Sequence, residues 1–178
     1  FHDHGHESNP DVPRGRDTRS IMGLNLRMSE LQAAVGLAQL DKLDYIIEKN
    51  RHNKSLLKSL IKNNDNIKFR KIVEEDGELA DTLIFYFKTN KEAHDFLEKY
   101  NISGYFTKNL PDAIDWHFAG TWNHMFVNDK NYKDTWSSEW PITDNLLRRS
   151  ISIPILVGHQ DEDIIKHSEI INNILRSI

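Results

Sequence analysis

The feature that most constrains the fold is a stretch without helix-breaking residues, from Leu31 to about Ile61. It contains no proline, and its only glycine is Gly36. Ser29 and Gln32 have the spacing of a capping box at its beginning, so a helix is expected to start there. Uninterrupted, such a helix has about 33 residues and a length of roughly 50 Å at 1.5 Å per residue. This length is unusual within one globular domain and predicts a helix that links two parts of a structure.

The two halves of this helix differ in composition. Between Leu31 and Leu40 nearly every residue is small or apolar, which predicts burial on all sides. Beyond Asp41 the apolar residues form one stripe opposite charged residues, so this half is expected to lie on a surface. The run Ala33–Gly36 permits the close approach of another backbone, from either a second subunit or a missing domain.

The remaining sequence predicts an α/β fold in which the long helix leads into a small domain of a few strands covered by helices. Residues 1–28 have no regular period and are expected to form a loop or arm that reaches the active site, residues 29–62 the long helix, and residues 63–178 the small C-terminal α/β domain. Within that domain we expect strands at Ile67–Ile72, Leu83–Phe87 (fully buried), Gly104–Thr107 and Ser150–Ile155, the last at an edge or ended by Pro154. We also expect one helix capped by Asn90 and a final helix opened by Asp161. The aromatic-rich residues 108–140 yield no prediction of secondary structure.

Composition excludes several classes of function. The formal net charge is -4 and the pI is about 6.1, and no block of lysine and arginine forms a local basic face, so nucleic-acid binding is not expected. Cysteine is absent, which excludes disulfides and thiolate metal sites and fits a reducing cytoplasm. No apolar run approaches the roughly 18 residues of a membrane span. We expect a cytoplasmic protein, and the opening at Phe1 without methionine suggests a fragment.

One continuous run carries a resemblance to a known family. Residues Gly23–Leu40, GLNLRMSELQAAVGLAQL, closely resemble a signature of the DegT/DnrJ/EryC1/StrS aminotransferases. These are fold-type-I pyridoxal-phosphate enzymes that move an amino group from glutamate to a keto sugar. His4-Gly5 before the run and Ser152–Ile155 near the C-terminus are similar to family features in the same order. The resemblance implies that this chain is the C-terminal part of such an enzyme, in a homodimer with shared active sites.

Three further segments resemble one branch of that family. They are Asp3–Glu7, Pro13–Arg19 and Trp116–Trp122. This branch aminates the eight-carbon acid sugar Kdo at its eighth carbon, giving 8-amino-3,8-dideoxy-octulosonate for bacterial lipopolysaccharide. Other branches act on nucleotide-linked keto sugars through the same scaffold.

The resemblance also implies that no catalytic residue lies in this chain. The family's Schiff-base lysine and its acidic partner for the pyridinium nitrogen precede the matching part, so both are expected upstream. Lys42 and Lys49 fall on predicted polar helix faces and are poor substitutes. The chain alone is therefore expected not to catalyse transamination.

Asn25 and Arg27 are the cofactor-binding residues that the resemblance implies. Asn25 would donate a hydrogen bond to the cofactor phosphate across the dimer interface, and Arg27 would bind that phosphate or a substrate carboxylate. An amide and a guanidinium just before a helix N-terminus make a suitable anion site. In the alternative interpretation, Asn25 satisfies loop backbone and Arg27 pairs with Glu30.

The predicted substrate-binding residues are basic or imidazole side chains. Several guanidinium groups match a carboxylated sugar, and the alternatives are a solvated arm with local salt bridges or, for His117 and His124, half-buried packing residues. The candidates are His4, His6, Arg14, Arg16, Arg19 and His117.

Two other classes of function stay open on sequence alone. The residues His2, Asp3, His4, His6 and Glu7 have side chains that bind zinc, although no helical Glu-x-x-His pair accompanies them. The chain could also be a dimerisation or binding domain without catalytic activity.

Overall fold

The computed structural model describes residue 11, residue 16 and the ranges 28–61, 65–111, 114–126, 128–131 and 136–178. The elements in chain order are α1 (Glu30–Leu40), α2 (Leu43–Leu60), β1 (Ile67–Phe69), β2 (Thr82–Phe87), α3 (Asn90–Ile102), α4 (Ile114–His117), the 3-10 helix η1 (Ala119–Thr121), α5 (Asn123–Phe126), α6 (Trp136–Glu139), α7 (Pro141–Arg148), β3 (Ser150–Pro154) and α8 (Asp161–Leu175). The predicted α/β class is confirmed.

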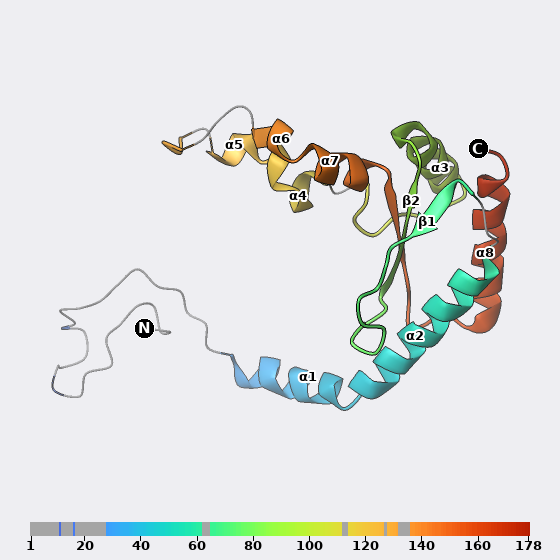
Figure 1. The fold of residues 1–178 in the computed structure, drawn as a ribbon. Coiled ribbons are helices and arrows are strands. Elements are labelled where there is room, and N and C mark those ends of the chain that lie inside the picture. Colours follow the sequence, from blue (N-terminus) through green and yellow to red (C-terminus); the bar gives the residue numbers. More distant parts are fainter. Residues whose placement is uncertain are drawn as a thin grey trace. The chain divides into compact units, whose positions relative to one another are not determined.

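The chain divides into two compact units, Phe1–Asp44 and Tyr45–Ile178. The first contains α1, and the second contains the sheet and the other helices, with most of α2 (Figure 1). The division into an arm, a helix and a small domain at residues 28 and 62 stays a prediction, because most of the arm lies outside the described residues.

In place of the single helix predicted over Leu31–Ile61, the structure has α1 and α2, separated by a turn at Asp41 and Lys42. The backbone N–H of Lys42 donates to Gln39 O at 3.1 Å, which closes the end of α1 with the tighter bond typical of helix termini. Asp41 is the C-cap of α1, and Asp44 lies in the first turn of α2, where the helix dipole stabilises negative charge. Asp44 thus favours a new helix start, although no proline or glycine marks the break.

The three strands form one antiparallel sheet in the order β1-β2-β3. Leu83 pairs with Ile153 and Phe85 with Ile151, so these side chains share one face of the sheet. The residues of β2 alternate between buried and half-buried, and the prediction of a fully buried strand is therefore wrong. The reason is that an antiparallel sheet packed on one face leaves the other partly open.

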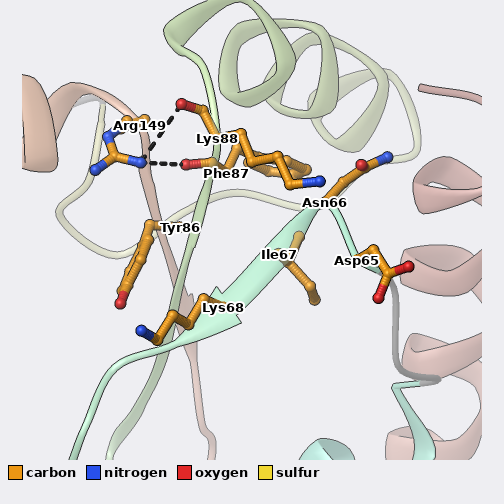
Figure 2. Close-up of a pocket in the computed structure, with 8 residues that line it drawn as sticks. All are labelled: Asp65, Asn66, Ile67, Lys68, Tyr86, Phe87, Lys88 and Arg149. Atoms are coloured by element: carbon orange, nitrogen blue, oxygen red, sulfur yellow. Dashed lines mark hydrogen bonds between the residues drawn. The ribbon is translucent and has the colours of Figure 1, made fainter.

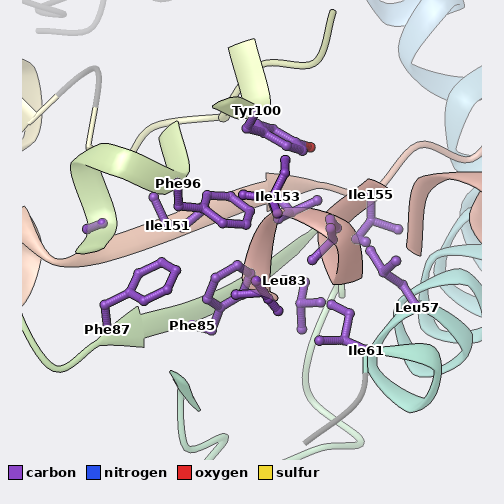
Figure 3. Packing of buried hydrophobic residues seen from close by; sticks show 14 of the residues in the cluster. Leu57, Ile61, Leu83, Phe85, Phe87, Phe96, Tyr100, Ile151, Ile153 and Ile155 are labelled. Atoms are coloured by element: carbon purple, nitrogen blue, oxygen red, sulfur yellow. The ribbon is translucent and has the colours of Figure 1, made fainter. Parts of the chain in front are cut away.

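The core lies on the face of the sheet that carries Phe85 (Figure 3). Phe96 of α3 contacts Phe85 edge-on, with ring centroids 5.6 Å apart. The fully or largely buried cluster combines residues of α2, β2, α3, β3 and α8, among them Leu57, Leu83, Phe85, Phe87, Phe96, Tyr100, Ile151, Ile153, Ile164 and Ile171. Ile164 and Ile171 of α8 belong to this core, so they mark the inner face of that helix.

Helices α2 and α8 lie beside one another in this unit (Figure 1). The Asn172 side chain donates to the carbonyl of Leu60 at 2.9 Å, and the Asn53 side chain donates to the carbonyl of Leu156 at 2.9 Å. Asn172 of α8 thus bonds to the backbone of α2, and the buried Asn53 of α2 bonds to the backbone of the loop that precedes α8. Specific hydrogen bonds therefore add to apolar packing in fixing the position of the two helices.

The predicted last strand is confirmed as β3, which lies at a sheet edge and ends at Pro154. Residues 150–153 are nevertheless buried. The preceding chain covers this edge, because Lys108 N donates to Ser152 O at 2.8 Å and Ser152 N donates to Leu110 O at 3.1 Å. A sheet edge protected in this way is closed to pairing with another chain.

Two further predictions need correction. Asn90 is the first residue of α3, and its cap is Thr89, which forms a capping box with Glu92. The expected strand at Gly104–Thr107 is irregular chain, in which Tyr105 stacks on His167 with ring centroids 4.3 Å apart. Tyr105 is therefore held by aromatic stacking and not by pairing in a sheet.

Candidate functional site

Most of the predicted site residues lie outside the described part of the chain. These are the predicted cofactor ligands Asn25 and Arg27 and the predicted substrate ligands His4, His6, Arg14 and Arg19. Arg16 is described and is exposed in irregular chain. The roles of all these residues stay predictions. The arm's histidines and acids, on which the zinc hypothesis depends, lie outside the described residues too.

The helix that follows the predicted cofactor ligands is well defined at its start. Ser29 Oγ accepts from the backbone N–H of Gln32 at 3.3 Å, and the Gln32 side chain accepts from the backbone N–H of Ser29 at 2.8 Å. The capping box predicted from the sequence is therefore present. It fixes where α1 begins, at Glu30, three residues after Arg27.

The apolar surface of α1 is not buried within this chain. Leu31, Val35, Leu37 and Leu40 are 76%, 55%, 65% and 62% exposed. The prediction that this half of the helix is buried on all sides is wrong for the isolated chain. Each such side chain would gain about 1.5–3 kcal/mol on full burial, so this apolar surface is suited to contact with another element.

His117 ends α4 and is exposed. The next residue, Phe118, is buried and contacts Trp140 edge-on, with ring centroids 6.4 Å apart. Gly120 lies against the Phe118 ring so closely that an added Cβ would stand 2.5 Å from two of its atoms. His124 is exposed as well. Both histidines are therefore accessible, which disagrees with the interpretation of them as half-buried packing residues and leaves a substrate-binding role for His117 as a prediction.

Among the described lysines, Lys54 is the only buried one, and its ammonium group is paired with the Glu78 carboxylate. The expectation that the Schiff-base lysine lies upstream of this chain stays a prediction.

The described residues contain neither a group of metal-binding side chains nor a membrane-spanning helix. In that part of the chain, histidine and acidic side chains do not gather in a group of three or more able to hold a metal ion. No helix among the described residues is both long and apolar enough to cross a membrane.

An open pocket of about 470 Å³ lies where β1 begins and β2 ends (Figure 2). Lys68, Lys88 and Arg149 line it together with Tyr86 and Asp65. Arg149 Nη1 donates to the carbonyl of Phe87 at 2.8 Å, and its guanidinium lies 5.6 Å from the centre of the Tyr86 ring. The pocket therefore combines positive charge with one phenol hydroxyl.

Sequence reasoning missed this pocket. Lys68 and Tyr86 are far apart in sequence and meet only through the antiparallel register, which pairs them directly. A Lys at a strand position opposite an aromatic residue is the only local signal, and it becomes useful once the register is known.

The chain belongs to the DegT/DnrJ/EryC1/StrS aminotransferase family, whose model matches residues 1–172. This match covers nearly the whole chain.

Solved structures of sugar aminotransferases share the fold. The chain is similar to Helicobacter pylori PseC, an aminotransferase involved in the biosynthesis of pseudoaminic acid, at 14% identity and a TM-score of 0.71, with 100% of this chain and 45% of that one covered. It is similar to 3-amino-5-hydroxybenzoic acid synthase at 18% identity and a TM-score of 0.72, with 100% of this chain and 46% of that one covered. It is similar to DesI, solved in the presence of its TDP-sugar product, at 20% identity and a TM-score of 0.65. This match covers 98% of this chain and 41% of that one. The chain thus spans less than half the length of these structures.

Proposed function

We propose that this chain is the C-terminal part of a pyridoxal-phosphate-dependent aminotransferase that transfers an amino group from glutamate to a keto sugar. The observation that carries the proposal is the family match over residues 1–172, which includes the segment Gly23–Leu40. The bound cofactor supplies the electron sink for the amino transfer. In this proposal the anchoring lysine lies upstream of this chain, as the family resemblance implies.

In this proposal Asn25 and Arg27 bind an anion at the active site of the other subunit of a homodimer. The Asn25 amide donates to the cofactor phosphate, and the Arg27 guanidinium binds that phosphate or the carboxylate of a substrate. The start of α1 at Glu30, directly after the cap Ser29, supports an anion site there, because the positive end of a helix dipole favours negative charge. The exposed apolar surface of α1 supports a partner on that helix.

We assign the acceptor as an acid sugar, and specifically as the 8-oxo form of Kdo used for lipopolysaccharide. The arm carries the basic residues His4, His6, Arg14, Arg16 and Arg19. Guanidinium groups bind a carboxylate through paired hydrogen bonds, which matches an acid sugar better than a neutral one. We also propose a substrate-binding role for His117, which is exposed at the end of α4. The reaction takes place in the cytoplasm.

The cofactor site is tested by replacing Asn25 with alanine in the full protein and measuring how much pyridoxal phosphate stays bound during dialysis. Loss of a hydrogen bond to a charged group costs about 1.5–3 kcal/mol, so the dissociation constant is expected to rise by roughly 10- to 100-fold. The matched control is Asn101→Ala, at an exposed position in the last turn of α3. Equal cofactor retention in the two variants would contradict the role of Asn25.

A further inference from the structure

We propose that the pocket between the start of β1 and the end of β2 binds a small organic phosphate. The pocket lies wholly within the compact unit Tyr45–Ile178, and the proposal does not depend on the aminotransferase activity. It would give the protein an anion site separate from the residues predicted for cofactor and sugar binding.

The first argument is the charge of the pocket. Lys68 and Arg149 line one side of the pocket, and in Figure 2 the Lys88 ammonium lies on the other side, near Asn66. Within the described residues none of these three groups pairs with a carboxylate, although the protein as a whole is acidic. Like charges gathered without a counter-charge repel each other, and an anion bound among them removes that repulsion.

Asp65 also lines the pocket but does not neutralise these groups. In Figure 2 it lies on the opposite side of the hairpin end from Arg149 and Lys68. The uncompensated positive charge is therefore concentrated on the Arg149 side.

The second argument is that Arg149 is already held in position. Its Nη1 donates to the carbonyl of Phe87 at 2.8 Å, and its Nε donates to the Asn145 side chain at 2.9 Å. The other terminal nitrogen points away from those carbonyls in Figure 2, and no bond to it is found within the described residues. A guanidinium fixed in advance loses little entropy when its remaining donors bind a ligand.

The third argument is that two more donors lie on the same side. Lys68 and Tyr86 are directly paired across β1 and β2, so both side chains extend from one face of the sheet. Figure 2 shows the Lys68 ammonium and the Tyr86 hydroxyl at the same edge of the pocket, below the Arg149 guanidinium. Two cations and a neutral O–H donor suit a phosphate, whose several oxygens accept bonds from different directions.

The size of the pocket indicates more than a free ion. Its volume of about 470 Å³ falls within the roughly 300–1,000 Å³ typical of small-molecule sites. The phosphate group is expected to bind near Arg149 and Lys68, with the organic part extending toward Asn66 and Lys88. We therefore expect a ligand the size of a sugar phosphate.

The test is isothermal titration of the purified protein, first loaded with pyridoxal phosphate to fill any cofactor site and then dialysed free of unbound cofactor, which as an organic phosphate would compete for this pocket. The probes are glucose 6-phosphate, gluconate, glucose and inorganic phosphate at low ionic strength. Glucose 6-phosphate is expected to bind most tightly, and glucose not to bind. If glucose binds as well as its phosphate, or inorganic phosphate binds as tightly as the organic one, the proposal is wrong.

Two lysine substitutions test whether glucose 6-phosphate binds in this pocket. Lys68→Gln is expected to weaken glucose 6-phosphate binding about 10-fold, the loss of one charge-assisted hydrogen bond. Lys71→Gln removes the same charge from an exposed position outside the pocket and is expected to change binding less than about 2-fold. Equal effects of the two variants would show a response to net charge alone and overturn the proposal. The titration can be repeated without pyridoxal phosphate, so a protein that does not bind the cofactor still gives a separate answer for this pocket.

Discussion

His167 is expected to make the stability of the domain sensitive to pH. It is 3% exposed, is hydrogen-bonded through Nε2 to the Tyr100 hydroxyl at 2.7 Å, and stacks on Tyr105. Burial, with a smaller contribution from the charge of His159, lowers the pKa of His167 from 6.5 to about 4. The folded protein therefore holds this imidazole neutral at pH values where the unfolded chain protonates it.

The sign and size of the effect follow from proton linkage. Because the folded state binds the proton more weakly, stability from His167 is fully present above pH 6.5 and falls as the pH is lowered toward 4. One pKa unit corresponds to about 1.4 kcal/mol, so the total loss is about 3 kcal/mol over this interval. Below pH 4 both states are protonated and this contribution no longer changes.

The measurement is the free energy of unfolding in urea at pH values from 7 to 4, for wild type and for His167→Phe. Phenylalanine keeps an aromatic ring beside Tyr105 but does not titrate. It leaves the Tyr100 hydroxyl without its partner, which lowers stability by about 1–3 kcal/mol at every pH. From pH 6.5 to 4 the free energy of unfolding of the wild type is expected to fall by about 3 kcal/mol relative to that of the variant, so the variant becomes as stable as the wild type or more stable. Parallel curves over that range would refute the reasoning.

Two further substitutions test packing and charge in the same unit. Gly120→Ala is expected to destabilise the fold by about 1–3 kcal/mol in thermal or chemical denaturation, because its Cβ would displace the Phe118 ring. The same change at Gly36, where nothing lies within 4 Å of the added Cβ, is expected to be neutral or to stabilise by up to about 1 kcal/mol; equal losses at both sites would contradict the packing argument. Glu78→Ala is expected to cost about 2 kcal/mol in urea, since it leaves the buried ammonium of Lys54 unpaired, and an unchanged midpoint would show that this ion pair contributes nothing.

Local patterns predicted the elements whose signals are contained in a few consecutive residues. The capping box at Ser29, the apolar run of β2 and the acidic start of α8 all correspond to observed structure. For α1 and α8 the cause lies in one turn, where side chains bond the first backbone N–H groups. For β2 it lies in one short run of apolar residues. The family resemblance likewise rested on consecutive residues, Gly23–Leu40, and the family match confirmed it.

Features that depend on distant contacts could not be predicted in the same way. The helix break at Asp41 contains no proline or glycine. In the segment Gly104–Thr107, Tyr105 stacks on the distant His167 and does not pair in a sheet. The pocket at Arg149 exists because the strand register brings Lys68 beside Tyr86, and no periodicity encodes that register. The candidate cofactor site stays a prediction, because its residues precede the described part of α1.

The central claim is that this chain completes an enzyme that takes its amino group from glutamate. The most direct measurement is the visible absorbance of the purified protein with bound pyridoxal phosphate before and after addition of L-glutamate, followed by mass spectrometry of the 8-oxo Kdo acceptor. The account predicts that glutamate changes the cofactor's spectrum and that the acceptor gains one amino group while the spectrum returns. A protein that binds no pyridoxal phosphate, or whose bound cofactor is unchanged by glutamate, would contradict it.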